Sequence, residues 1–325
     1  MRIGVNPEKL KKAKHNYFLH RVIIPVYIPN LEEEYYKDSF EVFKKCIYSL
    51  FKTINKNTTV ISVIDNNCSS EISKFIQELL EECKIQKLIK YSENKGKVYP
   101  ILSEIKASYE PYLTISDADV FFMNNWEREV FDIFHNFPKA AVVSPLPCPF
   151  LYKYLNRPLL VNEFFNIKLD LNVKPENFQL FEQGVNPKKK FFEGKKWNWK
   201  EKQYIIKHKK IKACVGATHF VATIKREYLD FNKLLGTKFV FNNGDENEYL
   251  EKFIEENGGY RLSTMDTFAY HMGNTVENWI EDYDHSNTQI MRTKNVDNNL
   301  RNKNKFYFLT YRIVFKFLSV FFYKN

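Results

Sequence analysis

The sequence is poor in residues that break regular structure, and it has no pattern that would cross-link or anchor the chain. Its 325 residues include only 10 glycines and 12 prolines, which excludes collagen-like and linker-dominated proteins. The five cysteines are odd in number and lack metal-ligand spacing, so we expect neither a disulfide framework nor a zinc site. No stretch of about 18 uncharged apolar residues exists, and the apolar run 22–28 is too short for a signal peptide. We therefore expect a cytoplasmic protein without an ordinary membrane-spanning helix.

The composition is that of a folded protein whose positive charge is concentrated in two segments. With 44% hydrophobic and 27% charged residues, the chain can bury a sizeable core. The formal net charge is +10. Segment 188–212 has eleven lysines against two glutamates, and 299–325 has six lysines or arginines and no acid. The rest is mildly acidic, which argues against a nucleic-acid partner and favours local contact with something anionic.

Strand-like and helix-like segments alternate over the first 145 residues. Strand–helix alternation with almost continuously apolar strands predicts an α/β fold, in which a parallel sheet is covered by helices on both faces. Ligands of such sheets bind beyond the carboxyl ends of the strands. The predicted strands are 22–28, 59–64, 88–91, 112–116 and 140–144, and the predicted helices are 39–54, 72–80 and 126–134.

The periodicity is lost from about 148 to 212, where proline, asparagine and lysine alternate with aromatic residues. It returns with a predicted strand at 214–224, a helix at 246–256 and an extended segment at 260–270.

An Asp-x-Asp sequence, Asp117-Ala118-Asp119, closes the predicted strand 112–116. Two carboxylates at a strand end can hold one hard cation, Mg²⁺ or Mn²⁺, between themselves and a diphosphate. Asp65-Asn66-Asn67 follows another strand and is expected at the same edge of the sheet. An ordinary solvated turn is the alternative for both sequences.

Four segments in order resemble the nucleotide-sugar glycosyltransferases of the GT-A fold, and in particular the large inverting family 2. They are Pro25-Val26-Tyr27, Asp65-Asn66-Asn67, Asn94-Lys95-Gly96 and Asp117-Ala118-Asp119. The resemblance covers residues 20–145 well and 213–275 more loosely. It implies a Rossmann-like, mostly parallel sheet with a nucleotide-sugar-binding half at 1–147 and an acceptor-binding half at 213–298. Residues 148–212 would form a Lys- and aromatic-rich insertion.

The resemblance also implies roles for individual residues. The metal, Mn²⁺ or Mg²⁺, would be held by Asp119 and Asp117 and completed by His271, although a histidine satisfied by local hydrogen bonds is the alternative. The nucleotide sugar would contact Pro25, Val26, Tyr27, Asp65, Asn67, Lys95, Asp117 and Ala118.

Two further sites are expected in the second half of the chain. The resemblance implies that Asp245 is the general base and Glu246 the second choice; the alternative for Asp245 is a helix cap. His219 is a possible sugar contact, with a core histidine as the alternative.

The tail 299–325 contains a very apolar segment that carries Arg312 and Lys316. Such a sequence predicts a basic amphipathic helix over 305–324 that lies on an anionic membrane surface. A helix packed on the protein body, or at a dimer interface, is the alternative. Segment 188–212 fits a flap near the acceptor or a plain solvated hairpin.

Together these features predict a metal-dependent glycosyltransferase at the inner face of the cell membrane. It would move a sugar from a nucleoside diphosphate, UDP by preference, to a hydroxyl of a surface glycan or lipid-linked acceptor, with inversion. A retaining transferase, a nucleotidyltransferase and a non-catalytic glycan-binding protein are the alternatives.

Overall fold

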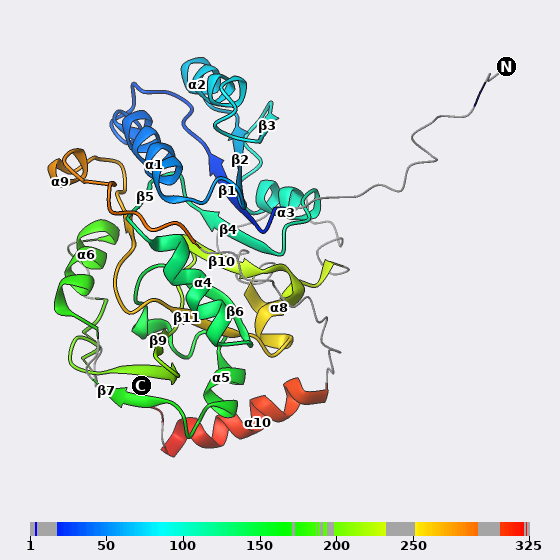
Figure 1. The fold of residues 1–325 in the computed structure, drawn as a ribbon, viewed down its shortest axis with the longest axis vertical. Coiled ribbons are helices and arrows are strands. Elements are labelled where there is room, and N and C mark those ends of the chain that lie inside the picture. Colours follow the sequence, from blue (N-terminus) through cyan, green and yellow to red (C-terminus); the bar gives the residue numbers. More distant parts are fainter. Residues whose placement is uncertain are drawn as a thin grey trace.

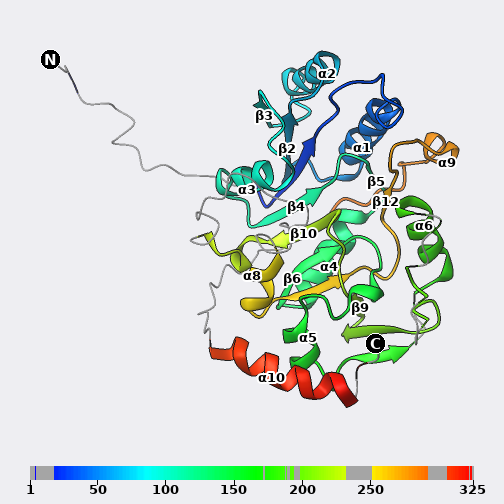
Figure 2. The same ribbon diagram turned by 180° about the vertical axis from the view of Figure 1, so that it is seen from behind.

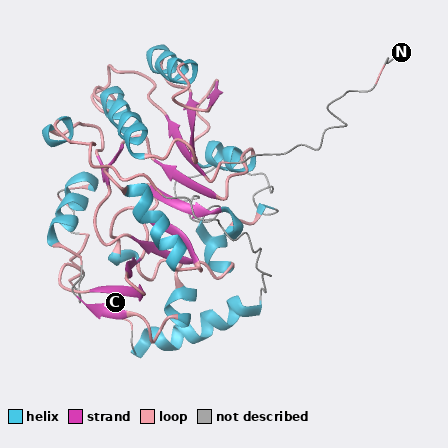
Figure 3. Cartoon of the chain, viewed as in Figure 1, coloured by secondary structure: helices cyan, strands magenta, loops and turns pink. Residues whose placement is uncertain are grey.

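The computed structural model describes residues 4, 18–170, 173–186, 188, 191–193, 198–231, 251–291, 306–321 and 323. They form one large mixed sheet flanked by helices, together with a two-stranded sheet at one end of it (Figures 1 and 3). The strands are β1 (His20–Val26), β2 (Thr59–Asn66), β3 (Lys87–Tyr91), β4 (Tyr112–Ser116), β5 (Val120–Phe122), β6 (Ala140–Ser144), β7 (Lys168–Asp170), β8 (Gln203–His208), β9 (Ile211–Val215), β10 (Val221–Lys225), β11 (Tyr260–Ser263) and β12 (Ala269–His271). The α-helices are α1 (Ser39–Thr53), α2 (Ser70–Glu81), α3 (Val98–Lys106), α4 (Trp126–Asn136), α5 (Arg157–Asn162), α6 (Pro175–Val185), α8 (Lys252–Glu256), α9 (Asn278–Glu281) and α10 (Phe306–Phe321).

The strand order of the large sheet is β3-β2-β1-β4-β10-β6-β11-β9-β8-β7. Strands β3, β2, β1, β4, β6, β11 and β8 run in one direction, while β10, β9 and β7 run in the other. The sheet is therefore mostly parallel, as predicted. The carboxyl ends of β1, β2 and β4 lie at one edge, where the loops of the predicted site follow.

Alternate residues of the central strands pack on opposite faces of the sheet. On one face Val22 and Ile24 join the core formed with α1, α2 and α4, while on the other Ile23 joins the core formed with α3 and α8. Figure 2 shows α3 and α8 from their own side of the sheet. Burial on both faces explains why these strands are apolar at nearly every position.

The predicted strand 214–224 is wrong, because the chain forms two strands there instead of one. β9 pairs with β8 and β11, whereas β10 pairs with β4 and β6. Between them Gly216 adopts φ +119°, and a Cβ at this position would lie 2.3 Å from the carbonyl oxygen of Cys148. The predicted extended segment 260–270 is likewise divided, into β11 and β12.

The C-terminal helix α10 packs along α5 at the far end of the molecule from α1 and α2 (Figure 1). Phe315 and Leu318 face the core, and the buried Tyr323 donates a hydrogen bond to the carbonyl oxygen of Leu160. Within the described ranges, no helix combines the length and the hydropathy that crossing a membrane requires.

A polar network is buried beneath the parallel strands. His20 Nδ1 lies 3.0 Å from Glu127 Oε1, and His20 Nε2 lies 2.6 Å from Thr114 Oγ1. Glu127 Oε2 accepts a hydrogen bond from the backbone N–H of Asn55 at 2.8 Å, and its Oε1 accepts another from the Thr59 hydroxyl. The network joins α4 to β1, β2 and β4, on which the candidate site depends.

We expect Glu127→Ala to lower the free energy of unfolding by about 3 kcal/mol, because it leaves several buried donors without an acceptor. Glu129→Ala is the matched control on the same helix, where the carboxylate pairs with Arg128 near the surface. It should cost less than about 1 kcal/mol. Urea unfolding of both variants tests this, and equal losses would contradict the role given to the network.

Candidate functional site

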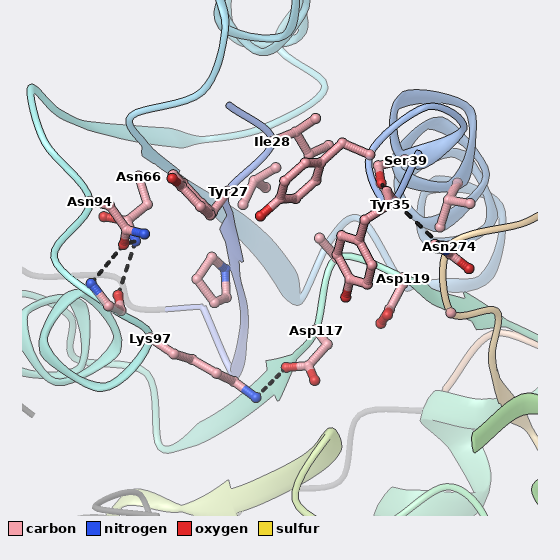
Figure 4. A pocket seen from close by; sticks show the side chains of 17 residues that line it. Tyr27, Ile28, Tyr35, Ser39, Asn66, Asn94, Lys97, Asp117, Asp119 and Asn274 are labelled. Carbon is pink, nitrogen blue, oxygen red and sulfur yellow. Dashed lines mark hydrogen bonds and ion pairs between the residues drawn. The ribbon is translucent and has the colours of Figure 1, made fainter. Parts of the chain in front are cut away.

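A pocket of about 380 Å³ lies beyond the carboxyl ends of β1, β2 and β4. Its size suits a nucleotide-sized ligand. Figure 4 shows Asn66 and Asn94 at one end of the pocket, Asn274 at the other, and Lys97 extended toward Asp117 between them. The lining residues are Pro25, Val26, Tyr27, Ile28, Tyr35, Tyr36, Ser39, Val42, Asn66, Asn94, Gly96, Lys97, Asp117, Ala118, Asp119, Gly273 and Asn274.

Three tyrosines form an aromatic wall of this pocket. The rings of Tyr27 and Tyr36 meet edge to face at 6.3 Å, and those of Tyr35 and Tyr36 at 5.0 Å. Tyr27 and Tyr35 stay largely exposed, so their ring surfaces are accessible to a flat ligand. The predicted contacts Pro25, Val26 and Tyr27 lie in the pocket; Tyr35 and Tyr36, in the loop before α1, were missed because no periodicity marks them.

Asn66 organises the loop between β3 and α3. Its side-chain amide donates to Asn94 Oδ1 at 2.9 Å and to the Gly96 carbonyl oxygen at 3.0 Å, while its Oδ1 accepts from the Lys95 backbone N–H at 2.9 Å. Lys95 itself is not among the lining residues, and its ammonium group pairs with Glu93. Two positions on, Lys97 lines the pocket and its Nζ lies 2.5 Å from Asp117 Oδ1. Lys95 was the predicted nucleotide contact of this segment, whereas Lys97 was not predicted.

Asp65 and Asn67 do not line the pocket. The Asp65 side chain is 1% exposed and closes the turn between β2 and α2. It accepts hydrogen bonds from the Cys68 backbone N–H at 2.8 Å and from the Ser73 hydroxyl at 2.5 Å. Asn67 is exposed and adopts φ +71° in the same turn. The segment thus forms a turn that Asp65 closes, and Asn66 rather than Asp65 lines the pocket.

Asp117, Asp119 and His271 come together at the other end of the pocket. Each offers one ligand atom, and these atoms all lie within 4.8 Å of one another. His271 Nε2 is 3.4 Å from Asp119 Oδ2. Asp119 Oδ1 is buried and accepts no hydrogen bond from the described residues. One imidazole and two carboxylates are a donor set that fits Mn²⁺ or Mg²⁺.

Strand pairing aligns the histidine with the carboxylates. β12 pairs antiparallel with β5, so that His271 lies opposite Val120, and the Met272 N–H donates to the Asp119 carbonyl oxygen at 2.8 Å. His271 Nδ1 lies 3.2 Å from the carbonyl oxygen of Gly184 in α6, a contact in which Nδ1 is the donor. That hydrogen bond leaves Nε2 as the ring nitrogen that faces Asp119 and could bind a cation. A Cβ on Gly184 would lie 2.3 Å from the His271 carbonyl oxygen, so the close approach requires glycine.

The negative charges of the cluster are only partly balanced by their surroundings. Burial raises the pKa of the Asp119 carboxyl to about 6, the interaction with His271 opposes this rise, and the negative charge of Asp117 adds to it. A divalent cation bound between Asp117 and Asp119 would offset the cost of burying the Asp119 carboxylate and reduce the repulsion between the two carboxylates. The cluster is thus chemically suited to hold a divalent ion next to an anionic ligand.

The predicted base residues Asp245 and Glu246 lie outside the described residues. His219, the possible sugar contact, is exposed rather than buried in the core. Asn274, from the loop after β12, lines the pocket close to Tyr35, and no sequence signal marked it.

Among solved structures, several glycosyltransferases resemble the chain. S. aureus TarS 1-349 is 11% identical with a TM-score of 0.45, and the alignment covers 77% of this chain and 59% of the TarS 1-349 chain. Mannosyltransferase PcManGT from Pyrobaculum calidifontis, in complex with GDP-Man and Mn²⁺, is 12% identical with a TM-score of 0.43 and coverages of 78% and 55%. The complex of TarS 1-349 with UDP-GlcNAc is 11% identical with a TM-score of 0.43 and coverages of 80% and 62%. The chain spans less than two thirds of the length of these structures, and no curated protein matches its sequence significantly.

The sequence model of one family matches residues 22–230, which include most of the residues that line the pocket and the Asp-x-Asp sequence, but not His271, Gly273 or Asn274. The predicted α/β fold class of GT-A type is confirmed. Because this match covers more than half of the chain, the protein belongs to glycosyl transferase family 2.

Proposed function

We propose that this glycosyltransferase moves a sugar from a nucleoside diphosphate to an acceptor hydroxyl with the help of a divalent cation held by Asp117, Asp119 and His271. The observation that carries the proposal is the convergence of these three ligand atoms within 4.8 Å at one end of a nucleotide-sized pocket. Asp117 and Asp119 come from one strand end and His271 from a strand about 150 positions later, so their convergence is a property of the fold and not of one acidic turn.

Different residues of the pocket suit the two parts of a nucleotide. The aromatic wall of Tyr27, Tyr35 and Tyr36 offers ring faces for a nucleobase, and Asn94, held by Asn66, adds a polar side chain to the lining. Lys97 and the cation site lie toward Asp117, where they would balance the charge of a diphosphate. We retain UDP as the preferred nucleotide.

Mn²⁺ suits the cation site better than Mg²⁺ because imidazole is one of the three ligands. When bound, the cation neutralises charge that develops on the departing diphosphate. Asp117 and Lys97 would orient the diphosphate, and the His271–Gly184 hydrogen bond would hold the imidazole in position.

For the acceptor side we retain the prediction from the sequence. Asp245, with Glu246 as the second choice, would take the proton of the acceptor hydroxyl and support attack with inversion. The acceptor would be a surface glycan or a lipid-linked sugar, in the synthesis of a surface polysaccharide.

The outward face of α10 supports contact with a membrane. Ile313, Phe317 and Val320 are 66%, 63% and 72% exposed, and Arg312 and Lys316 are exposed between them. The helix contains no acidic residue. A helix that packs on α5 by one face and presents apolar and cationic side chains on the other suits the anionic inner leaflet of the cell membrane.

We expect Asp119→Asn to abolish Mn²⁺-dependent binding of UDP and to lower transfer at least about a hundredfold, because the cation loses an anionic ligand. Calorimetry with UDP in the presence and absence of Mn²⁺ measures the first effect. Asp132→Asn, on α4 away from the pocket, is the control and should behave like wild type. Undiminished Mn²⁺-dependent binding by Asp119→Asn would contradict the metal site.

Replacing either lysine of the β3–α3 loop distinguishes the sequence prediction from the observed geometry. Lys97→Ala should weaken UDP binding about tenfold, since a charged contact to the diphosphate is lost. Lys95→Ala removes the same charge two positions away but outside the pocket lining, and we expect a smaller loss. If Lys95→Ala weakened UDP binding more than Lys97→Ala, Lys95 would be the lysine that contacts the nucleotide, as predicted from the sequence.

For the membrane, the double variant Phe317→Ser/Val320→Ser should bind vesicles of phosphatidylglycerol and phosphatidylcholine at least about tenfold more weakly, because it removes exposed apolar surface. Flotation of the full chain with vesicles measures this. Tyr109→Ser, which removes a 68% exposed aromatic ring between α3 and β4, is the matched control. Equal binding by the double variant and wild type would refute docking through α10.

A further inference from the structure

A second, smaller cavity adjoins the nucleotide pocket, and Lys97 lines both. Its volume of about 20 Å³ is enough for one water molecule or one hydroxyl group. The apolar walls come from α3 and from strands β4, β6 and β10. The polar lining residues are Lys97, His219, Glu251 and Arg261. The cavity therefore shares with the nucleotide pocket the lysine that pairs with Asp117.

Two of these residues form a buried ion pair with unused hydrogen-bonding capacity. Arg261 is 1% exposed, and its Nη2 donates to Glu251 Oε1 at 2.8 Å and to the Ala217 carbonyl oxygen at 3.1 Å. Within the described part of the chain, Arg261 Nε and Nη1 and Glu251 Oε2 are buried without a hydrogen-bond partner, while the guanidinium group lies over the ring of Tyr154 at 5.3 Å. Buried polar atoms in folded proteins are almost always satisfied, so two open donors beside an open acceptor point to a ligand atom that is absent from the protein itself.

We propose that this cavity receives one hydroxyl group of the transferred sugar, and that Glu251 and Arg261 determine which sugar is accepted. A hydroxyl is the complementary group because it can accept from the guanidinium and donate to the carboxylate at once. A phosphate or carboxylate ligand would be repelled by Glu251, and an apolar group would leave all three atoms unsatisfied. The volume limits the occupant to a single hydroxyl.

The position of the cavity favours the transferred sugar over the nucleoside. Its shared residue Lys97 pairs with Asp117, at the end of the pocket where the diphosphate is expected, and the sugar is attached to that diphosphate. This inference rests on the proposed function, since it assumes that a nucleoside diphosphate occupies the larger pocket. A site that hydrogen-bonds a substrate hydroxyl discriminates strongly against analogues that lack it.

The test compares the binding of UDP with that of UDP-sugars by the full chain in Mn²⁺, measured by calorimetry. The probes are UDP, UDP-glucose, UDP-galactose, UDP-N-acetylglucosamine and the monodeoxy analogues of whichever sugar binds most tightly. The variant is Glu251→Gln, which keeps the size of the side chain and replaces the open acceptor by an amide donor. We expect it to bind UDP within twofold of wild type and the preferred UDP-sugar about tenfold to a hundredfold more weakly.

Glu255→Gln is the matched control. Glu255 lies on α8, which begins directly after Glu251. It is fully buried and pairs with Arg157, whose Nε donates to Glu255 Oε1 at 2.7 Å, but it does not line the cavity. It should lose stability to a similar degree without a selective loss of sugar binding. Should E251Q not fold, E251D, which withdraws the carboxylate and keeps its charge, takes its place.

The monodeoxy donors identify the hydroxyl. One monodeoxy donor should bind wild type about as weakly as the parent UDP-sugar binds E251Q. For E251Q, the affinities for this analogue and for the parent UDP-sugar should be equal. The inference is overturned if E251Q weakens UDP and UDP-sugar equally, if it weakens neither, or if no monodeoxy donor binds wild type more weakly than the parent. If an ordered water molecule fills the cavity instead of a sugar hydroxyl, one of these three contradicting results is expected. If wild type binds no nucleotide in Mn²⁺, the proposed function itself fails, which is a different outcome.

Discussion

The short pairing of β12 with β5 is the interaction on which the site depends. It places His271 opposite Val120, so that a histidine from late in the chain lies beside the carboxylates that close β4. The N–H of Met272 on the carbonyl oxygen of Asp119 fixes the register, and the approach of α6 at Gly184 fixes the imidazole. A shift of one residue in this ladder would turn the histidine to the other side of the strand. The geometry of three side chains thus rests on a few backbone hydrogen bonds.

The large sheet gives those hydrogen bonds a rigid base. Its parallel strands are packed on both faces, and the His20–Glu127 network joins α4 to three of them. The loops at the carboxyl ends are therefore held by a framework that has little freedom to deform. At one such loop, Asp65 accepts the hydrogen bonds that close the turn after β2, and Asn66 donates to the loop that carries Lys97.

Some of the buried polar atoms that lack a hydrogen-bond partner among the described residues lie at the pocket and at the neighbouring cavity. Asp119 Oδ1 belongs to the cluster of Asp117, Asp119 and His271, and Arg261 and Glu251 line the cavity that shares Lys97 with the pocket. Elsewhere the buried ion pair Arg157–Glu255 shows how the same residue types satisfy one another when no ligand is needed. The exposed face of α10 lies far from this end (Figure 1), so contact with a lipid surface there leaves the pocket accessible.

Periodicity along the chain predicted β1 to β4, β6, α1, α2 and α4 and the fold class, because alternation and helical spacing are local properties of a sequence, but it did not predict α3 or β5. Tertiary structure alone decided that Lys97 rather than Lys95 enters the pocket, that Tyr35 and Asn274 line it, and that Asp65 serves a turn. It also decided the break at Gly216, which follows from the close approach of the Cys148 carbonyl oxygen and not from any neighbour in sequence. Each of these depends on which distant segments meet, and a single sequence does not record that.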